Sequence, residues 1–374
     1  MSNMTENKSS LVNKYVRSFT LICAFMLIAM YIFFEAFSFK EDFTVGMVML
    51  GSHLDDGRSQ MNHEKMEMVC NEMDVRLIVE EYVEESWEKC AQAVERMNEK
   101  GANAIVLDSA IYAKYVARLS VRYPHINFFC NNAGDVENTA CATYSPRVYQ
   151  ARFLSGILAG LETKSGKIGY VAAMENSEVN RGINAFTLGV KSVREDAEVL
   201  VSFTDSWNDA EKETKLATDL IEKEGVDIIT YHQDGDTVAE VAEKYQVGYI
   251  AFPEYKEAYS DKCLAVVRIN TEQLYKEMLK DCLTGYYKQN DRYWLGLEKN
   301  AVELQFCSDT VSDEIKLEIQ ETEQRLLEHR DVFSGEIKDN QGNLICAEDE
   351  TISDDMLFYK CTWLAEGVNV YEEK

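Results

Sequence analysis

Apolar runs separated by longer amphipathic stretches recur along residues 43–252 and predict strands alternating with helices. The strand-like runs are FTVGMVML (43–50), VRLIVEEY (75–82), NAIVLD (103–108), INFFC (126–130), KIGYVAA (167–173), VLVSFT (199–204), VDIITY (226–231) and VGYIAF (247–252). The helical stretches are 86–100, 110–123, 146–162, 177–194, 209–224 and 237–245. Strands joined by helices of this length predict an α/β protein with parallel sheets and right-handed crossovers.

The pattern restarts after residue 146, which predicts two α/β lobes in series. The last third adds the strand-like runs 263–269 and 301–306 and a charged helix at 313–330, whose alternating charges are typical of a solvated face. We expect several crossovers between the lobes, near residues 145, 265 and 290. The predicted parts are an N-terminal lobe of 43–145 with about 265–290, a C-terminal lobe of 146–264 with about 291–330, and a C-terminal segment of 331–374.

One segment near the N-terminus is strongly apolar. Residues 18–34, SFTLICAFMLIAMYIFF, carry no charge, and extension to Phe39 approaches the roughly 20 residues that cross a bilayer. Three basic residues precede it and predict a cytoplasmic tail (1–17), a transmembrane anchor (18–39) and lobes outside the cytoplasm. A cleaved signal peptide is the alternative, because Ala36-Phe37-Ser38 is an acceptable cleavage site. The expected location is a bacterial cell membrane crossed once.

The charge balance argues against nucleic acid as a partner. The chain holds 38 basic and 65 acidic residues, and without the first 40 residues 34 basic and 63 acidic residues remain, a net charge of −29. Such a surface repels phosphate backbones and anionic lipid headgroups. Solubility outside the cell is the simpler explanation of the excess acid.

The sequence lacks the motifs of common cofactors and metals. The segment GLETKSGK (160–167) has one residue too many for a phosphate-binding loop, and Ile168 stands where Ser or Thr is needed. Nine of the ten cysteines lie outside the apolar segment, without C-x-x-C spacing, which points to buried free thiols. A local bridge between Cys130 and Cys141 is the alternative. We therefore expect no cofactor and no metal.

Polar side chains follow most of the predicted strands. Ligands of open parallel sheets bind beyond the carboxyl ends of the strands, so these positions are the candidate ligand-binding residues. They are Asp55, Asp56, Arg58, Ser59, Asp108, Asn131, Asn132, Trp207, His232, Asp234, Glu254 and Arg268. Helix capping is the competing explanation for about half of them, and for one of Asp55 and Asp56 in particular.

The residue types fit a neutral ligand rich in hydroxyl groups. Carboxylates and amides bind ribose hydroxyls and base edges, and an aromatic ring stacks on a base. Trp207 is the most informative of these positions, because its neighbours Asp205, Ser206, Asn208 and Asp209 offer the indole no local apolar patch. The pattern predicts a small polar molecule as the ligand.

Several blocks of the chain resemble the basic membrane protein family of bacterial solute receptors for ABC transporters, which includes purine nucleoside binders. These blocks are DDG (55–57), YQARFLSGILAGLETKSGKIGYVAAMENSEVNRGINAFTLGVKSV (149–193), FTDSWNDAEKETKLATDLIEKEGVDII (203–229), YWLGLEKNAVEL (293–304) and VFSGEIKDNQGNLICAEDETISDDMLFYKCTWLAEGV (332–368). The resemblance extends over residues 43–370 and implies the two-lobed type I fold of periplasmic binding proteins. It also implies that the protein is no enzyme.

The resemblance assigns roles to some candidate residues. Asp56 matches an acidic residue of the family's first segment, whereas Arg58 and Ser59 stand where the family has a base-stacking aromatic. Asn131 or Asn132 replaces an Asp, and Trp207 matches the aromatic of the second lobe. Glu254 corresponds to an acidic ribose contact, and Arg268 aligns with a basic residue that is often Lys.

The resemblance implies that the protein captures a nucleoside-like ligand for uptake through an ABC transporter permease. A membrane-tethered sensor without a dedicated permease is the first alternative, because the apolar anchor and the missing aromatic are unusual for a released receptor. A carboxylate-based hydrolase is the second, because acidic residues are abundant, but the chain has no nucleophile elbow.

Overall fold

The computed structural model describes residues 26, 43–54, 58–131, 141–253, 259–307, 309, 311–328 and 332–372. The predicted tail, and the predicted anchor apart from Met26, lie outside these residues. In the part of the chain that is described, no helix is long and apolar enough to cross a membrane. The compact unit Thr44–Lys374 contains two mainly parallel sheets.

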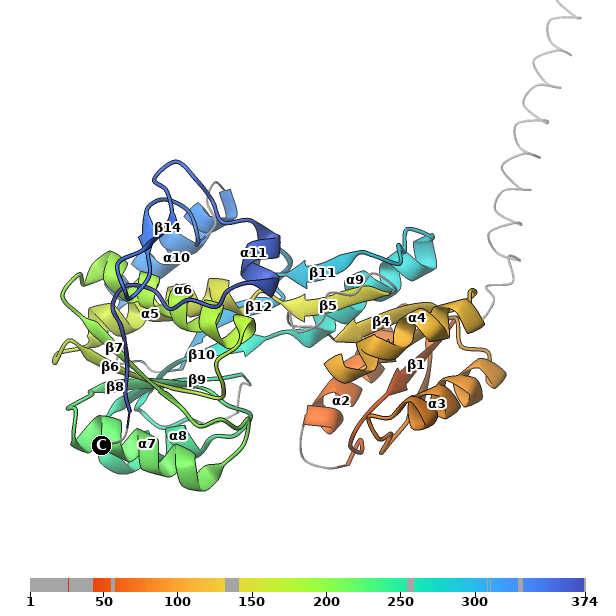
Figure 1. The fold of residues 1–374 in the computed structure, drawn as a ribbon, viewed down its shortest axis with the longest axis horizontal. Coiled ribbons are helices and arrows are strands. Elements are labelled where there is room, and N and C mark those ends of the chain that lie inside the picture. The colour runs from red at the N-terminus through yellow and green to blue at the C-terminus, as the bar shows by residue number, and fades with distance from the viewer. Residues whose placement is uncertain are drawn as a thin grey trace, which may run out of the picture. The chain divides into compact units, whose positions relative to one another are not determined.

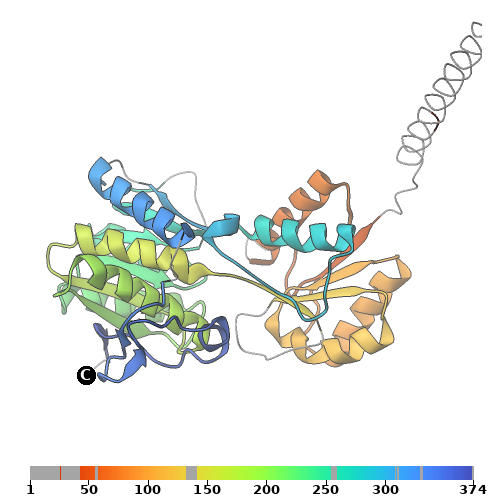
Figure 2. The ribbon, with the colours of Figure 1, turned by 90° about the horizontal axis from the view of Figure 1, so that it is seen from above.

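The first sheet has the strand order β11-β5-β4-β3-β1-β2, and all its pairings are parallel. Its strands are β1 (Thr44–Val48), β2 (Arg76–Glu80), β3 (Ala104–Leu107), β4 (Asn127–Asn131), β5 (Ala142–Pro146) and β11 (Arg292–Leu295). Helices α3 (Trp87–Glu99) and α4 (Ala113–Arg122) cover one face, and α2 (Arg58–Met73) and α9 (Thr271–Thr284) pack together on the other (Figure 2).

The second sheet has the order β12-β10-β9-β8-β6-β7-β15, with only the β10–β12 pair antiparallel. Its strands are β6 (Lys167–Ala172), β7 (Glu198–Phe203), β8 (Ile228–His232), β9 (Gly248–Ala251), β10 (Cys263–Ile269), β12 (Val302–Phe306) and β15 (Val368–Val370). Helices α5 (Val148–Glu162) and α6 (Ser177–Val193) cover one face, and α7 (Ala210–Glu222) and α8 (Thr237–Tyr245) cover the other (Figure 1).

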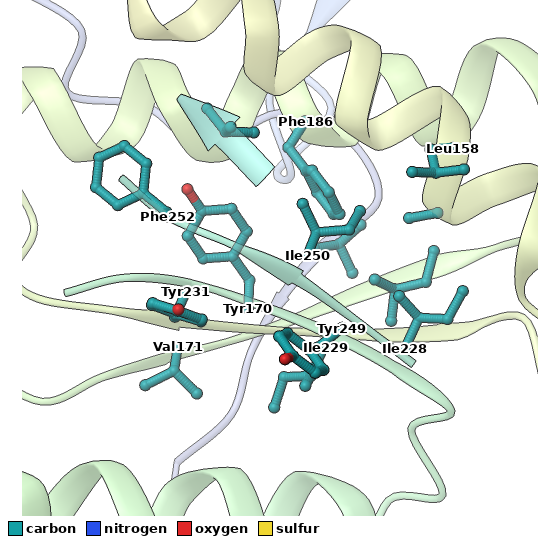
Figure 3. Close-up of a cluster of buried hydrophobic side chains, with 14 of the residues drawn as sticks. Leu158, Tyr170, Val171, Phe186, Ile228, Ile229, Tyr231, Tyr249, Ile250 and Phe252 are labelled. Carbon is teal, nitrogen blue, oxygen red and sulfur yellow. The ribbon is translucent and has the colours of Figure 1, made fainter. Parts of the chain in front are cut away.

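The predicted α/β class with parallel sheets flanked by helices is confirmed. The strands at the centres of both sheets are buried on both faces, and side chains such as Tyr170 and Val171 point to opposite faces of the second sheet (Figure 3). This is why those strands read as continuous apolar runs in the sequence. The pattern missed β5 and β11, because ATYSP and RYWL mix polar and apolar residues although both strands pair in the sheet.

Three connections run between the sheets. The chain passes from β5 into α5, from β10 into α9, and from β11 through a 3₁₀ turn (Leu297–Lys299) into β12. β11 falls in the range expected for the second lobe but pairs with β5 in the first sheet, which places the last connection after Leu295. The lobe boundaries themselves stay predictions.

The C-terminal segment packs against these connections. α10 (Asp313–Glu328) precedes this segment, which contains β13 (Ile337–Lys338), β14 (Leu344–Cys346) and α11 (Asp354–Tyr359) and ends with β15. Asp354 accepts a hydrogen bond from Arg147 Nη1 at 2.8 Å, and Asp355 accepts one from Arg292 Nη2 at 2.7 Å. Acidic residues at the first turn of α11 therefore bind one arginine beside the β5–α5 connection and another on β11.

Helices α5 and α6 approach each other closely because each carries a glycine at the contact. An added Cβ would lie 2.0 Å from the Phe186 carbonyl oxygen at Gly156, and 2.1 Å from the Phe153 carbonyl oxygen at Gly189. Each glycine therefore lies against the backbone of the opposite helix. This explains why glycines occur at these positions in residues 149–193, the block that resembles the basic membrane protein family.

Replacing Gly156 by alanine is expected to lower the free energy of unfolding by about 1–3 kcal/mol, because the extra methyl group overpacks the α5–α6 contact. Chemical denaturation followed by circular dichroism measures this loss. Gly225→Ala is not a matched control, since Gly225 has a positive φ of 75°. Ser155→Ala changes the neighbouring position without adding volume. An unchanged midpoint for Gly156→Ala would show that the helices separate at no cost.

Candidate functional site

The strand orders place a topological switch point in each sheet. In the first sheet the chain leaves β1 toward β2 on one side and returns to β3 on the other, and in the second sheet β6 has the same relation to β7 and β8. Ligands of such sheets bind outside the carboxyl ends of the strands at the switch point. Asp108 follows β3, and His232 ends β8, so both belong to these positions.

Asp108 is half-buried, and its carboxylate accepts hydrogen bonds from two buried side chains. Asn62 Nδ2 lies 3.2 Å from Oδ1 and 2.9 Å from Oδ2, and the Tyr144 hydroxyl lies 2.9 Å from Oδ1. Burial raises the pKa of Asp108 above its ordinary value, although the charge of Arg58 and the two partners lower it. A carboxylate oriented in this way keeps lone pairs for the hydroxyl or amino groups of a ligand.

Arg58 and Ser59 open α2, directly after the loop that follows β1. The Ser59 hydroxyl accepts a hydrogen bond from Gly51 N at 3.1 Å, so it stabilises that loop. The Arg58 side chain is exposed. Partial desolvation by the surrounding protein by itself lowers the pKa of its guanidinium, but the carboxylates of Asp108, Asp234 and Glu178 outweigh this effect and raise the pKa. Arg58 thus interacts electrostatically with candidate residues from both sheets.

The loop after β1 is also bound by Glu81. His53 N and Nδ1 each lie 2.7 Å from Glu81 Oε1, and the Ser52 hydroxyl lies 2.8 Å from it. The backbone bond from His53, followed by the side-chain bonds from His53 and Ser52, lowers the pKa of Glu81 to about 2. Glu81 is therefore ionised at neutral pH and fixes the path of the chain toward α2.

Trp207 lies in the loop between β7 and α7 and is half-buried. Its ring meets the His232 ring edge to face, with centroids 5.9 Å apart, and the indole packs against the core of the second sheet. Its carbonyl oxygen accepts a hydrogen bond from Asp234 N at 2.8 Å. The polar neighbours in the sequence concealed this apolar surface, because it comes from β8. One of them, Asp209, caps α7.

His232 is only 2% exposed, and its ring also meets Phe252 edge to face at 4.7 Å. Burial, together with the positive charges of Arg152 and Arg181, lowers the pKa of His232 well below its ordinary value, so the ring is neutral at pH 7. Asp234, two residues later, has an exposed side chain, but the surrounding protein removes part of the water around its carboxyl group and so raises its pKa, while Arg58 lowers it. Trp207, His232 and Asp234 therefore form one contiguous group.

Among the described residues, the other candidates do not belong to the groups around Asp108 and around Trp207 and His232. Asn131 ends β4 and pairs in register with Tyr144, the hydroxyl partner of Asp108. Arg268 Nη1 lies 3.0 Å from Glu303 Oε1 on the antiparallel strand β12, so its charge already has a protein partner. Asp55, Asp56, Asn132 and Glu254 lie outside the described residues.

No metal centre is formed by the described residues, which contain no group of three His, Cys, Asp or Glu side chains able to hold an ion. The described cysteines are all free, and most of them are buried. Cys130 and Cys141, considered above as a local bridge, are both buried and form no disulfide. The site therefore offers carboxylates, amides, rings and an arginine, which bind organic ligands by hydrogen bonds and stacking.

A family model described as ABC transporter substrate-binding protein, PnrA-like, matches residues 43–341. The chain belongs to this family. A purine-binding protein of Brucella abortus is 28% identical over 312 residues, which cover 81% of this chain and 87% of that protein. A putative ABC transporter glucose-binding protein of Haloferax volcanii is 29% identical over 227 residues, 60% of this chain and 55% of that protein.

A solved structure shares the fold of this family member. The crystal structure of a transcriptional activator of the comK gene from Bacillus halodurans matches with a TM-score of 0.69 at 22% identity, over 76% of this chain and 98% of that one. The resemblance predicted from the sequence blocks is thus confirmed at the level of the family.

Sequence reasoning missed several side chains that shape the site of this family member. Asn62 could have been found, since it is a polar residue on the otherwise apolar face of α2 formed with Met66, Val69 and Cys70. Tyr144 had no such signal, because β5 was not predicted. Other missed residues are Arg152 and Phe252, which contact the second sheet's site from the core side.

Proposed function

We propose that this protein is an extracytoplasmic receptor that captures a nucleoside at the carboxyl ends of its two sheets for uptake through an ABC transporter permease. The observation that carries the proposal is the placement of Asp108 at one switch point and of Trp207 and His232 at the other. Family membership supports the role in transport. The purine-binding relative supports the class of ligand.

Asp108 and Trp207 suit the two different parts of a nucleoside, its ribose and its base. Asp108, oriented by Asn62 and Tyr144, is suited to accept hydrogen bonds from ribose hydroxyls. The indole of Trp207 is suited to stack on the base, which supplies about 1–3 kcal/mol per base. A nucleoside presents both features in one molecule, and we propose that it binds without being chemically changed.

The charges favour a nucleoside over a nucleotide. Arg58 is the positive group at the start of α2, and it interacts electrostatically with the carboxylates of Asp108, Asp234 and Glu178. A phosphate placed beside it would also face these three negative charges. We propose that the site admits neutral ligands and excludes phosphorylated ones.

We propose that the lobes lie outside the cytoplasm and that residues 18–39 anchor them to the membrane. The uncharged run of residues 18–34, preceded by Lys8, Lys14 and Arg17, supports this orientation. Protease added to intact cells should then degrade the bulk of the chain. Complete protection would reverse the proposed orientation.

The nucleoside itself is tested by thermal unfolding of the protein with adenosine, guanosine, inosine, AMP or glucose. A ligand that binds only the folded form at about 100 times its dissociation constant stabilises it by about 2.7 kcal/mol, so a nucleoside should raise the melting temperature. AMP and glucose should not. The glucose arm matters because of the relative from Haloferax volcanii. A shift with AMP or glucose alone would contradict the proposed ligand.

A membrane-tethered sensor is the second candidate, favoured by the anchor-like run of residues 18–34. The two roles differ in their effect on transport. Deleting the gene should abolish uptake of labelled nucleoside if the protein is a transport receptor. Unchanged uptake, together with nucleoside binding by the purified protein, would favour a sensor.

A further inference from the structure

Arg152 on α5 is a buried cation with no carboxylate in contact among the described residues. The residue is 0% exposed, and burial lowers the pKa of its guanidinium. A buried charge without an opposite charge is costly, and such residues cluster at functional sites. Its surroundings lie at the ends of β8 and β9, where the candidate site of the second sheet begins.

The guanidinium binds two residues near the end of β8, one through its side chain and one through its backbone. Arg152 Nη1 donates to Thr230 Oγ1 at 3.0 Å, and Nη2 donates to the Tyr231 carbonyl oxygen at 2.6 Å. The Thr230 hydroxyl in turn donates to the Ile250 carbonyl oxygen on β9 at 2.9 Å. One side chain thereby fixes the strand immediately before His232 and, through Thr230, its neighbour.

The same guanidinium also lies at the base of a column of rings. Its Cζ is 4.4 Å from the centre of the Phe252 ring. The centres of the Phe252 and His232 rings are 4.7 Å apart, and those of the His232 and Trp207 rings are 5.9 Å apart. Tyr170 lies on the same side of the sheet as Phe252 (Figure 3), and its ring centre is 5.3 Å from Cζ. These contacts connect the buried Arg152 guanidinium with Trp207, the residue whose ring we expect to stack on the base.

We propose that Arg152 is a positioning residue for ligand binding, which supports the ring column of Phe252, His232 and Trp207 from the core side. The proposal rests on the proposed function, in that Trp207 is taken as the wall against which the base stacks. Arg152 itself touches no ligand.

The groups around His232 explain why a charge at this place matters. Arg152 from α5 and Arg181 from α6 both repel a proton on the ring, and Tyr170 from β6 approaches from the same side. A Cβ on Gly182 would be 3.5 Å from both His232 Nδ1 and the Tyr170 hydroxyl. Among the described residues, none forms a hydrogen bond with His232 Nδ1. Protonation would place a third positive charge among buried groups.

Two variants separate the charge of Arg152 from its geometry. Arg152→Lys keeps the positive charge but loses the planar fork that donates to Thr230 and Tyr231 and stacks on Phe252. Arg152→Met removes the charge and keeps an apolar side chain of similar length. We expect each to weaken adenosine binding about tenfold, measured by calorimetry at pH 7.5.

The protonation of His232 gives a readout that a packing role would not change. Nuclear magnetic resonance of the histidine rings, with the His232 signal assigned through His232→Gln, should show no titration between pH 8 and pH 5 in the wild type or in Arg152→Lys. In Arg152→Met the pKa of His232 should rise, because the repelling charge is gone. The ratio of variant to wild-type affinity for adenosine should then fall as the pH is lowered.

The outcomes decide between positioning and packing. An unshifted His232 signal in Arg152→Met, or adenosine affinities within twofold of wild type in both variants, would overturn the proposal. If Arg152→Met does not fold, the affinity of Arg152→Lys still decides. If the wild type binds no nucleoside, the proposed function fails, while the His232 titration still tests whether Arg152 controls the ring.

Discussion

Replacing Trp207 by alanine is expected to weaken adenosine binding by about 1–3 kcal/mol, the contribution of one base–aromatic stack. The indole is half-buried and contacts His232, so closing of the site on a base would bury it further. Calorimetry measures the loss of affinity. Intrinsic fluorescence should also change when adenosine is added to the wild type, and this change should be absent in Trp207→Ala.

Trp87→Ala is the matched control for this experiment. Trp87 is also half-buried, but it lies at the start of α3, where the Arg118 guanidinium is 3.7 Å from its ring centre and the Tyr115 ring meets it edge to face. It should lose some stability and no affinity. If Trp207→Ala behaves in the same way, Trp207 is a packing residue, and Asp56, His232 and Asp234 remain the candidates for the wall of the site.

Replacing Asp108 by asparagine is expected to weaken adenosine binding by about 1.5–3 kcal/mol, the range for a hydrogen bond to a charged group. That loss corresponds to roughly tenfold to a hundredfold in the dissociation constant. The physical reason is that a neutral amide accepts a hydrogen bond from a ribose hydroxyl less strongly than a carboxylate does. Calorimetry at pH 7.5 measures the change.

Stability should respond to Asp108→Asn in the opposite direction from affinity. The pKa of Asp108 is raised in the folded protein, so its stabilising contribution is present at low pH and is lost as the pH rises through the folded-state pKa. Above the folded-state pKa the ionised carboxylate lowers stability, and the neutral amide avoids that penalty. The melting temperature of Asp108→Asn should therefore equal or exceed that of the wild type.

Asp227→Asn is the control with the opposite sign. Asp227 accepts hydrogen bonds from the Thr163 hydroxyl and the backbone N of Lys164 and Ser165, and these bonds lower its pKa although burial raises it. Its stabilising contribution is present above the unfolded-state pKa and is lost as the pH falls. Asp227→Asn should lower the melting temperature and leave affinity unchanged. Equal affinity losses in both variants would mean that Asp108 acts indirectly.

The positions of most strands and helices follow from local pattern. Segments such as 103–108 and 226–231 are apolar on both faces because the sheets are covered by helices on both sides, and this leaves a continuous run in the sequence. β5 and β11 leave no such run, because ATYSP and RYWL mix polar and apolar residues. The place where the chain returns from the first sheet to the second therefore needed the structure.

The candidate site likewise contains residues that the sequence reveals and residues that only the structure reveals. Asp108, Trp207, His232 and Asp234 could be selected from the sequence, because each follows a strand and the carboxyl ends of parallel strands face the ligand. Their partners could not. Asn62, Tyr144 and Arg152 lie within elements, and the sequence does not record which strand end each of them reaches.

The sequence by itself determined the α/β class and the family, and it selected the strand ends at which we propose that a ligand binds, because burial patterns and loop residues are local properties of the chain. The tertiary structure alone decided the state of those residues. Burial, followed by the charges of Arg152 and Arg181, keeps His232 neutral, and burial raises the pKa of Asp108; the groups responsible come from elements distant in the sequence. Charge interactions act through space, so only the folded arrangement of α5, α6 and the strand ends defines them.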